Sequence, residues 1–87
     1  MSGPRPADEA IAGAILALTA ARGPGRTICP SEAARALAGA NGGWRELMPS
    51  VRRVAGALAE RGALRVSQRG REVDSAAVQG PIRLGRP

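Results

Sequence analysis

The chain has 87 residues and a formal net charge of +6, from 13 basic residues, all of them arginine, and 7 acidic ones. Histidine is absent and cysteine occurs once, which excludes histidine triads, histidine metal sites, cysteine-only zinc sites and an internal disulfide. The length indicates one domain, and because Trp44 is the only aromatic residue, we expect its core to be small and aliphatic. With these sites excluded, we expect no cofactor and no enzymatic activity.

The sequence also argues against contact with a membrane. No apolar run approaches the ~20 residues that cross a bilayer, and the first residues lack the charged and then apolar pattern of a signal peptide. We therefore expect a cytoplasmic protein.

The N-terminal part predicts a helix after a short lead-in. Residues 1–6 contain glycine and proline, and we expect them to be disordered. Apolar residues with helical spacing begin near Ala7–Asp8, and the Gly23-Pro24-Gly25 run ends the pattern. Leu16 lies off the apolar stripe of this helix, where it can touch a second surface.

A short extended segment and a second helix follow. Residues 26–28 are too short for more than a single pairing at the edge of a sheet. Pro30 suits the first helical position, which makes Cys29 the N-cap and places Glu32 in the register of a capping box. This helix ends near Gly39.

A third helix follows a glycine-rich linker. Residues 44–48 form a helical turn, and Pro49 is either the first residue of the main helix or a kink within it. Apolar residues at helical spacing continue to Leu58, and Gly62 closes the helix.

The remaining chain predicts a hairpin and an extended tail. Residues 64–68 alternate between apolar and polar, Gly70 provides a turn, and residues 72–74 return as a second strand. Asp74 can cap a turn over 75–79. The tail over 81–84 either adds a strand to the sheet, crosses the first helix or docks on a partner; its apolar residues favour packing within the molecule.

The predicted core consists of the apolar residues that these patterns turn inward. They are Ile11, Ile15, Leu18, Ile28, Leu37, Trp44, Leu47, Val51, Val54, Leu58, Leu64, Val66 and Val73.

Helix, short strand, two helices and a hairpin is the order of a winged helix-turn-helix. The segments 31–37 and 51–66 resemble the second helix and the third helix with its following strand in bacterial winged regulators. The linker and helical turn over 39–48 are longer than the 3–4-residue turn of a helix-turn-helix, which puts the docking angle of the third helix in question.

A narrower resemblance rests on four short blocks in one order. Thr27–Glu32, Trp44–Pro49, Val51-Arg52 and Gly80–Leu84 are similar to a family of small bacterial proteins catalogued as domain of unknown function 3253. The resemblance implies a small, winged-helix-like bacterial protein and brings no activity.

Two groups of arginines are candidate contacts to DNA. Arg52 and Arg53 lie near the start of the third helix, where a recognition helix meets bases or phosphates. Arg65, Arg69 and Arg71 bracket the hairpin, which suits a minor groove or a pair of phosphates. The alternatives are a solvated helix face and a charged hairpin that avoids edge-to-edge association.

The placement of charge supports the hairpin more than the helices. Residues 1–60 carry a net charge of +2 and residues 61–87 carry +4. A basic excess favours nucleic acid as partner, although arginine in place of lysine is also what GC-rich coding produces.

Two single residues have a functional and a structural interpretation. A thiol at a helix N-terminus, as predicted for Cys29, can be redox-active, but a small residue that fits a strand-to-helix corner is favoured. Trp44 can stack on a partner, but we expect it to fill the core.

We therefore predict an α+β winged helix-turn-helix with three helices and a short β-hairpin wing, in a sheet of two or three strands. The domain covers residues 7–75, after a disordered lead-in over 1–6 and before a turn and tail over 76–87. The expected function is binding of double-stranded DNA, linked to transcription or the nucleoid. The alternative is a protein-interaction adaptor, with a protein partner or as a homodimer, that binds no nucleic acid. No catalytic, cofactor or metal site is expected.

Overall fold

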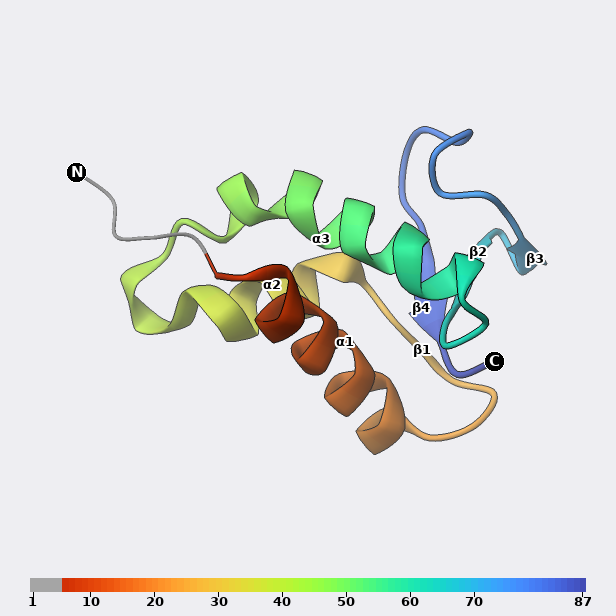
Figure 1. Cartoon of the computed structure of the whole chain (residues 1–87), viewed down its shortest axis with the longest axis horizontal. Coiled ribbons are helices and arrows are strands. Elements are labelled where there is room, and N and C mark those ends of the chain that lie inside the picture. The colour runs from red at the N-terminus through yellow and green to blue at the C-terminus, as the bar shows by residue number, and fades with distance from the viewer. Residues whose placement is uncertain (1–5) are drawn as a thin grey trace.

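A computed structural model describes residues 6–87, apart from the side chain of Asn41. Three helices pack against one another, and a small sheet lies beside the C-terminal half of the third (Figure 1). The helices are α1 (Asp8–Arg22), α2 (Pro30–Ala38) and α3 (Trp44–Glu60), with a 3-10 turn η1 (Gly39–Asn41) after α2. The strands are β1 (Thr27–Ile28), β2 (Arg65–Gln68), β3 (Arg71–Glu72) and β4 (Arg83–Gly85). The predicted disorder of the lead-in concerns residues that, Pro6 apart, lie outside the described part.

Local chemistry fixes the helix ends where the sequence predicts them. At the start of α2, the Cys29 backbone N–H donates to the Glu32 carboxylate at 2.8 Å, and Pro30 is the first helical residue. At the end of α3, Gly62 N–H donates to Ala59 and Ala63 N–H donates to Leu58, the bonding pattern of a Schellman motif. Both predicted termini are confirmed.

The connection between α2 and α3 is shorter than the sequence suggested. The turn over 44–48 is continuous with the main helix, and Pro49 lies inside α3 rather than at its start. Only residues 39–43 separate the two helices. The structure thus removes most of the departure from a helix-turn-helix connection.

The sheet has four strands, so the prediction of two or three is wrong. Its order is β1-β4-β2-β3, and every neighbouring pair is antiparallel. The predicted tail supplies β4, which lies between β1 and β2 and pairs Leu84 with both Ile28 and Val66. Intramolecular packing of the tail is therefore confirmed.

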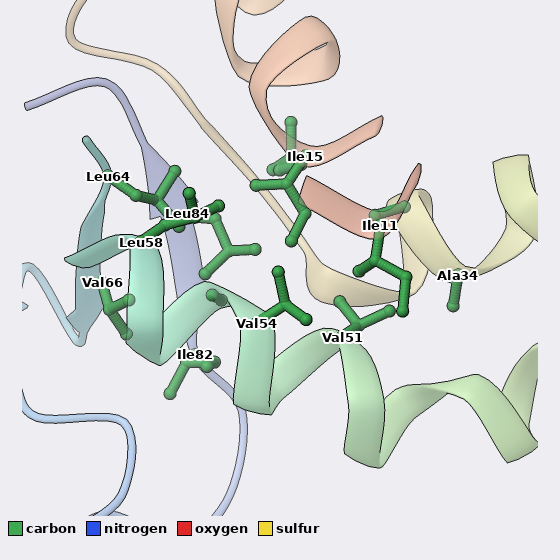
Figure 2. Packing of buried hydrophobic residues seen from close by; sticks show 13 residues of the cluster. Ile11, Ile15, Ala34, Val51, Val54, Leu58, Leu64, Val66, Ile82 and Leu84 are labelled. Carbon is green, nitrogen blue, oxygen red and sulfur yellow. The ribbon is translucent and has the colours of Figure 1, made fainter. Parts of the chain in front are cut away.

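The core lies where the helices meet the inner face of this sheet (Figure 2). Eight of the predicted core residues are buried, including Ile15 of α1, Val51 of α3 and Val66 of β2. Ile82 and Leu84 are also buried, although the predicted core omitted them. The others that were predicted lie half-buried around this cluster: Leu18, Leu37, Trp44, Leu47 and Val73.

These elements make an α+β fold consistent with a winged helix that carries a β-hairpin wing, as predicted. Within residues 6–87, no helix combines the length and the apolar character that crossing a membrane requires.

Candidate nucleic-acid interface

The β2–β3 hairpin presents arginine at a constrained position. Gln68 pairs with Arg71, so Arg69 and Gly70 alone form the turn. Both have positive φ, 54° for Arg69 and 82° for Gly70, as a type I′ turn requires. Glycine adopts this conformation without penalty, whereas a side chain such as that of Arg69 costs about 1 kcal/mol there.

The three predicted hairpin arginines are all exposed. Among the described residues, the side chains of Arg65, Arg69 and Arg71 form no hydrogen bond or ion pair with the protein. Arg69 and Arg71 flank Gly70 at the tip, whereas Arg65 lies at the other end of β2 and pairs with Gly85. The structure therefore places Arg69 and Arg71 together at the tip of the hairpin and Arg65 at the far end of β2.

Arg65 belongs to the sheet face that points away from the helices. Side chains alternate along a strand, so Arg65 of β2 and Arg83 of β4 lie opposite the buried Val66 and Leu84. The Arg83 guanidinium lies across this face and donates to the Oγ1 and the carbonyl oxygen of Thr27, at 3.0 and 3.2 Å. Arg83 thereby links β4 to the edge strand β1.

Arg52 of α3 points toward the connection between β3 and β4. Its guanidinium donates to the carbonyl oxygens of Gly80, at 2.9 Å, and Val78, at 3.3 Å. Gln68 holds the same connection from β2 through bonds to Gln79 and Pro81 at 2.8 and 3.1 Å. The positive charge of Arg52 is thus used in positioning a loop.

Gly56 allows this connection to approach α3 closely. A Cβ atom at this position would lie 2.6 Å from the Oγ of Ser75, which is closer than van der Waals contact. The loop begins with an Asx turn, in which the Asp74 carboxylate accepts from Ala76 N–H at 2.9 Å. Asp74 therefore caps the turn as predicted, and residues 74–80 lie beside the C-terminal half of α3.

Arg53 forms a two-bond ion pair with Asp8 at the start of α1. Its two Nη atoms lie 2.8 and 2.9 Å from the carboxylate oxygens. This hydrogen bonding, together with the charge of Arg53, holds the pKa of Asp8 below its ordinary value and raises the pKa of Arg53. Both side chains are about 60% exposed (60% and 61%), so solvent screens the pair strongly.

Acidic side chains gather beside the C-terminal half of α3. Glu60, Glu72 and Asp74 line one open hollow together with Gly56 and Ser75. Their negative charge opposes approach of a phosphate to this part of the helix. The C-terminal half of α3 is therefore unfavourable for phosphate, and of these carboxylates Glu72 lies in β3 beside Arg71.

A second group of arginines, which no sequence pattern predicted, lies at the opposite end of α3. The guanidinium carbons of Arg35 and Arg45 lie 4.4 and 4.5 Å from the centroid of the Trp44 ring. Trp44 itself is half-buried and packs against the edge of the core. No spacing rule links Arg35 to Trp44, because the turn between α2 and α3 brings them together.

Cys29 occupies a structural position. It is half-buried between β1 and α2, and its sulfur accepts a hydrogen bond from the Ser31 hydroxyl at 3.1 Å. The adjacent Glu32 carboxylate also forms an ion pair with Arg22. Its pKa is lowered chiefly by the Cys29 backbone N–H and further by Arg22.

Comparison with known proteins gives a family and no activity. A search of the curated proteins finds no match. The family model described as "Protein of unknown function (DUF3253)" matches residues 8–87, which span every helix and strand of the structure. The chain therefore belongs to the DUF3253 family.

Proposed function

We propose that this protein is a winged-helix DNA-binding protein that contacts the phosphate backbone of double-stranded DNA with its β2–β3 hairpin. Arg65, Arg69 and Arg71 supply the positive charge. Two observations support the proposal: these guanidiniums are exposed, and they are unpaired among the described residues. Arginine donors that are already free bind phosphate without first breaking a contact within the protein.

Arg69 carries the proposal. A type I′ turn favours asparagine or glycine at its first central position, yet arginine occupies it with φ at 54°. The folded domain gains no hydrogen bond or ion pair from this side chain in return, since Arg69 bonds to no described residue. A residue in a strained conformation whose side chain makes no such bond is a candidate for function.

Arg52 and Arg53 remain predicted DNA contacts, but we expect each of them to contribute less to DNA affinity than a hairpin arginine. Arg52 would have to release the carbonyls of Val78 and Gly80 before it could reach DNA. Arg53 would have to exchange Asp8 for a phosphate, which its exposure permits. Each exchange lowers the net gain, so the hairpin contributes more to affinity than α3.

Titration of a labelled random duplex at several salt concentrations tests the proposal. Each phosphate contact contributes about −0.9 to the slope of log affinity against log salt. We expect Arg69→Asn to weaken binding and to reduce the slope by about 1, while stability rises by about 1 kcal/mol because the strain is relieved. Arg86→Asn, at the opposite end of the sheet from the turn, is the control with equal charge loss and no expected stabilisation.

Two results would contradict the proposal. Absence of binding at ~50 mM salt excludes DNA as the ligand, because nonspecific contacts to phosphate are strong under that condition. Equal effects of Arg69→Asn and Arg86→Asn would mean that only net charge matters, and the hairpin would lose its assigned role.

A protein-interaction adaptor is the second candidate. One observation favours it: Ala12, Val54, Ala57 and Leu58 form an apolar floor between α1 and α3, with the Asp8–Arg53 ion pair at its side. Ala57→Glu places a charge on this floor. Loss of self-association or of a partner contact in that variant, with DNA affinity unchanged or absent, would support the adaptor.

A further inference from the structure

We infer that Arg35, Trp44 and Arg45 form a second phosphate-binding site for double-stranded DNA, at the end of the helical layer far from the hairpin. The inference rests on the proposed function and extends it to a surface that neither the sequence pattern nor the family assigns. We call these three residues the Arg-Trp-Arg cluster.

Stacking on tryptophan orders the two arginines without using their donors. Both guanidinium carbons lie within 4.5 Å of the Trp44 centroid, the range in which cation–π attraction acts. A guanidinium that lies over a ring keeps its N–H groups free at the periphery, and these groups bind phosphate oxygens in pairs. The cluster is therefore a pair of preorganised cations with unused donors.

The protein does not neutralise this charge within its described part. Arg35 and Arg45 are exposed, and neither belongs to the ion pairs found among residues 6–87, which are Arg22–Glu32 and Arg53–Asp8. Glu46 follows Arg45, but it lies on the far side of α3 from Trp44, because two residues are just over half a helical turn. The arginines of the cluster are therefore unpaired within the described residues, like those of the hairpin, whereas Arg52 and Arg53 are bonded within the protein.

The cluster and the hairpin lie at opposite ends of α3. Trp44 is the first residue of α3, and β2 follows the last residue Glu60 after a short turn; Figure 1 shows the α2–α3 connection and the hairpin at the two ends of the molecule. A helix of this length spans about 25 Å. Since a full turn of B-DNA is about 34 Å, the two sites can reach separate phosphates of one duplex.

The acidic hollow beside the C-terminal half of α3 is consistent with two separate sites. Glu60, Glu72 and Asp74 line the surface beside the C-terminal half of α3. These carboxylates disfavour a phosphate beside the C-terminal half of α3, whereas none of them lies at the Arg-Trp-Arg cluster.

Trp44 is the only tryptophan, so intrinsic fluorescence reports on the cluster alone. The experiment titrates the full chain with unlabelled duplex and follows Trp44 emission, while a labelled duplex reports total binding. We expect emission to change in parallel with binding. In the Arg35→Gln/Arg45→Gln variant, we expect the salt slope to fall by about 2 and the DNA-dependent change in emission to disappear.

Two further variants make the result specific. Arg61→Gln/Arg86→Gln removes two exposed arginines outside the cluster and should leave the response of Trp44 intact. Arg35→Lys/Arg45→Lys keeps the charge and should keep the slope while affinity falls, because lysine lacks the planar fork of donors.

The outcomes separate the two claims. If the duplex binds but Trp44 emission and the slope of the Arg35→Gln/Arg45→Gln variant match those of the unmodified chain, the second site is wrong and the hairpin proposal stands. If no duplex binds at ~50 mM salt, both proposals fall together.

Discussion

Arg52 and Arg53 of α3 carry the same charge as the hairpin arginines, but they differ in whether the guanidinium is bonded within the protein. Arg52 is bonded to two loop carbonyls and Arg53 to a carboxylate, whereas Arg65, Arg69 and Arg71 have no bonded partner among residues 6–87. A helical wheel or a charge count cannot separate these groups. The difference implies that Arg52 and Arg53 serve chiefly stability, and that the hairpin arginines are free to serve binding.

The largest expected effect comes from removing the hairpin charges together. Arg65→Gln/Arg69→Gln/Arg71→Gln should reduce the salt slope of duplex binding by about 3, since each arginine neutralises one phosphate in the proposed complex. The free energy of unfolding should change little, because no described contact is lost. Anisotropy titrations and urea denaturation measure the two quantities. A large loss of stability with an unchanged slope would reverse the comparison.

Substitution of Arg52 should have the opposite signature. Arg52→Met keeps most of the apolar stem and removes both bonds to the 78–80 segment. Hydrogen bonds from a charged group contribute about 1.5–3 kcal/mol each before screening by solvent, and we expect a total loss of about 2 kcal/mol with a small change in DNA affinity. Thermal denaturation measures the loss of stability. Arg61→Met, at an exposed position with no such bonds, is the control, and an equal loss there would contradict the assignment.

Breaking the Asp8–Arg53 pair should turn Arg53 from a bonded arginine into an unbonded one, like those of the hairpin. Asp8→Asn weakens the ion pair and leaves Arg53 available, so the salt slope of duplex binding should rise by up to about 1. Glu9→Gln makes the same charge change at the neighbouring exposed residue, which has no ion pair in the described structure. If both variants change the slope equally, the effect is one of net charge and Arg53 does not reach DNA.

The smallest expected effect concerns the pH dependence of stability. The pKa of Glu32 is lowered in the folded protein, first by the Cys29 backbone N–H. A lowered folded value means that the stabilisation is present above the ordinary pKa of 4.5 and is lost as pH falls through the folded value. Glu32→Gln can keep the capping bond but cannot titrate, so its stability should depend less on pH below about 4.5. Urea denaturation at several pH values measures this, and an unchanged pH dependence would contradict it.

Local rules predicted the helices better than the sheet. The capping pair Cys29 and Glu32 and the closing Gly62 are signals within a few residues, and both ends lie where they were expected. The position of β4 depends on pairing between distant segments, which no local pattern contains. The predicted core therefore omitted Ile82 and Leu84 although both are buried.

The candidate site was predictable in composition and not in geometry. The exposed hairpin arginines followed from alternation and from the turn at Gly70. The bond from Arg52 to Gly80 joins residues 28 positions apart, and the stacking of Arg35 on Trp44 depends on the turn between two helices. Contacts of this kind arise from tertiary packing, so sequence periodicity gave no sign of them.

The central place of β4 has a consequence for folding during synthesis. Arg83 and Thr27, which meet in the sheet, are 56 residues apart in the chain. β4 lies between β1 and β2, so the four-stranded order cannot form before residues 83–85 have been synthesised. Closing such distant contacts is slow, and until then Ile28 and Val66 lack their shared neighbour Leu84. Formation of β4 is thus the step that completes the sheet.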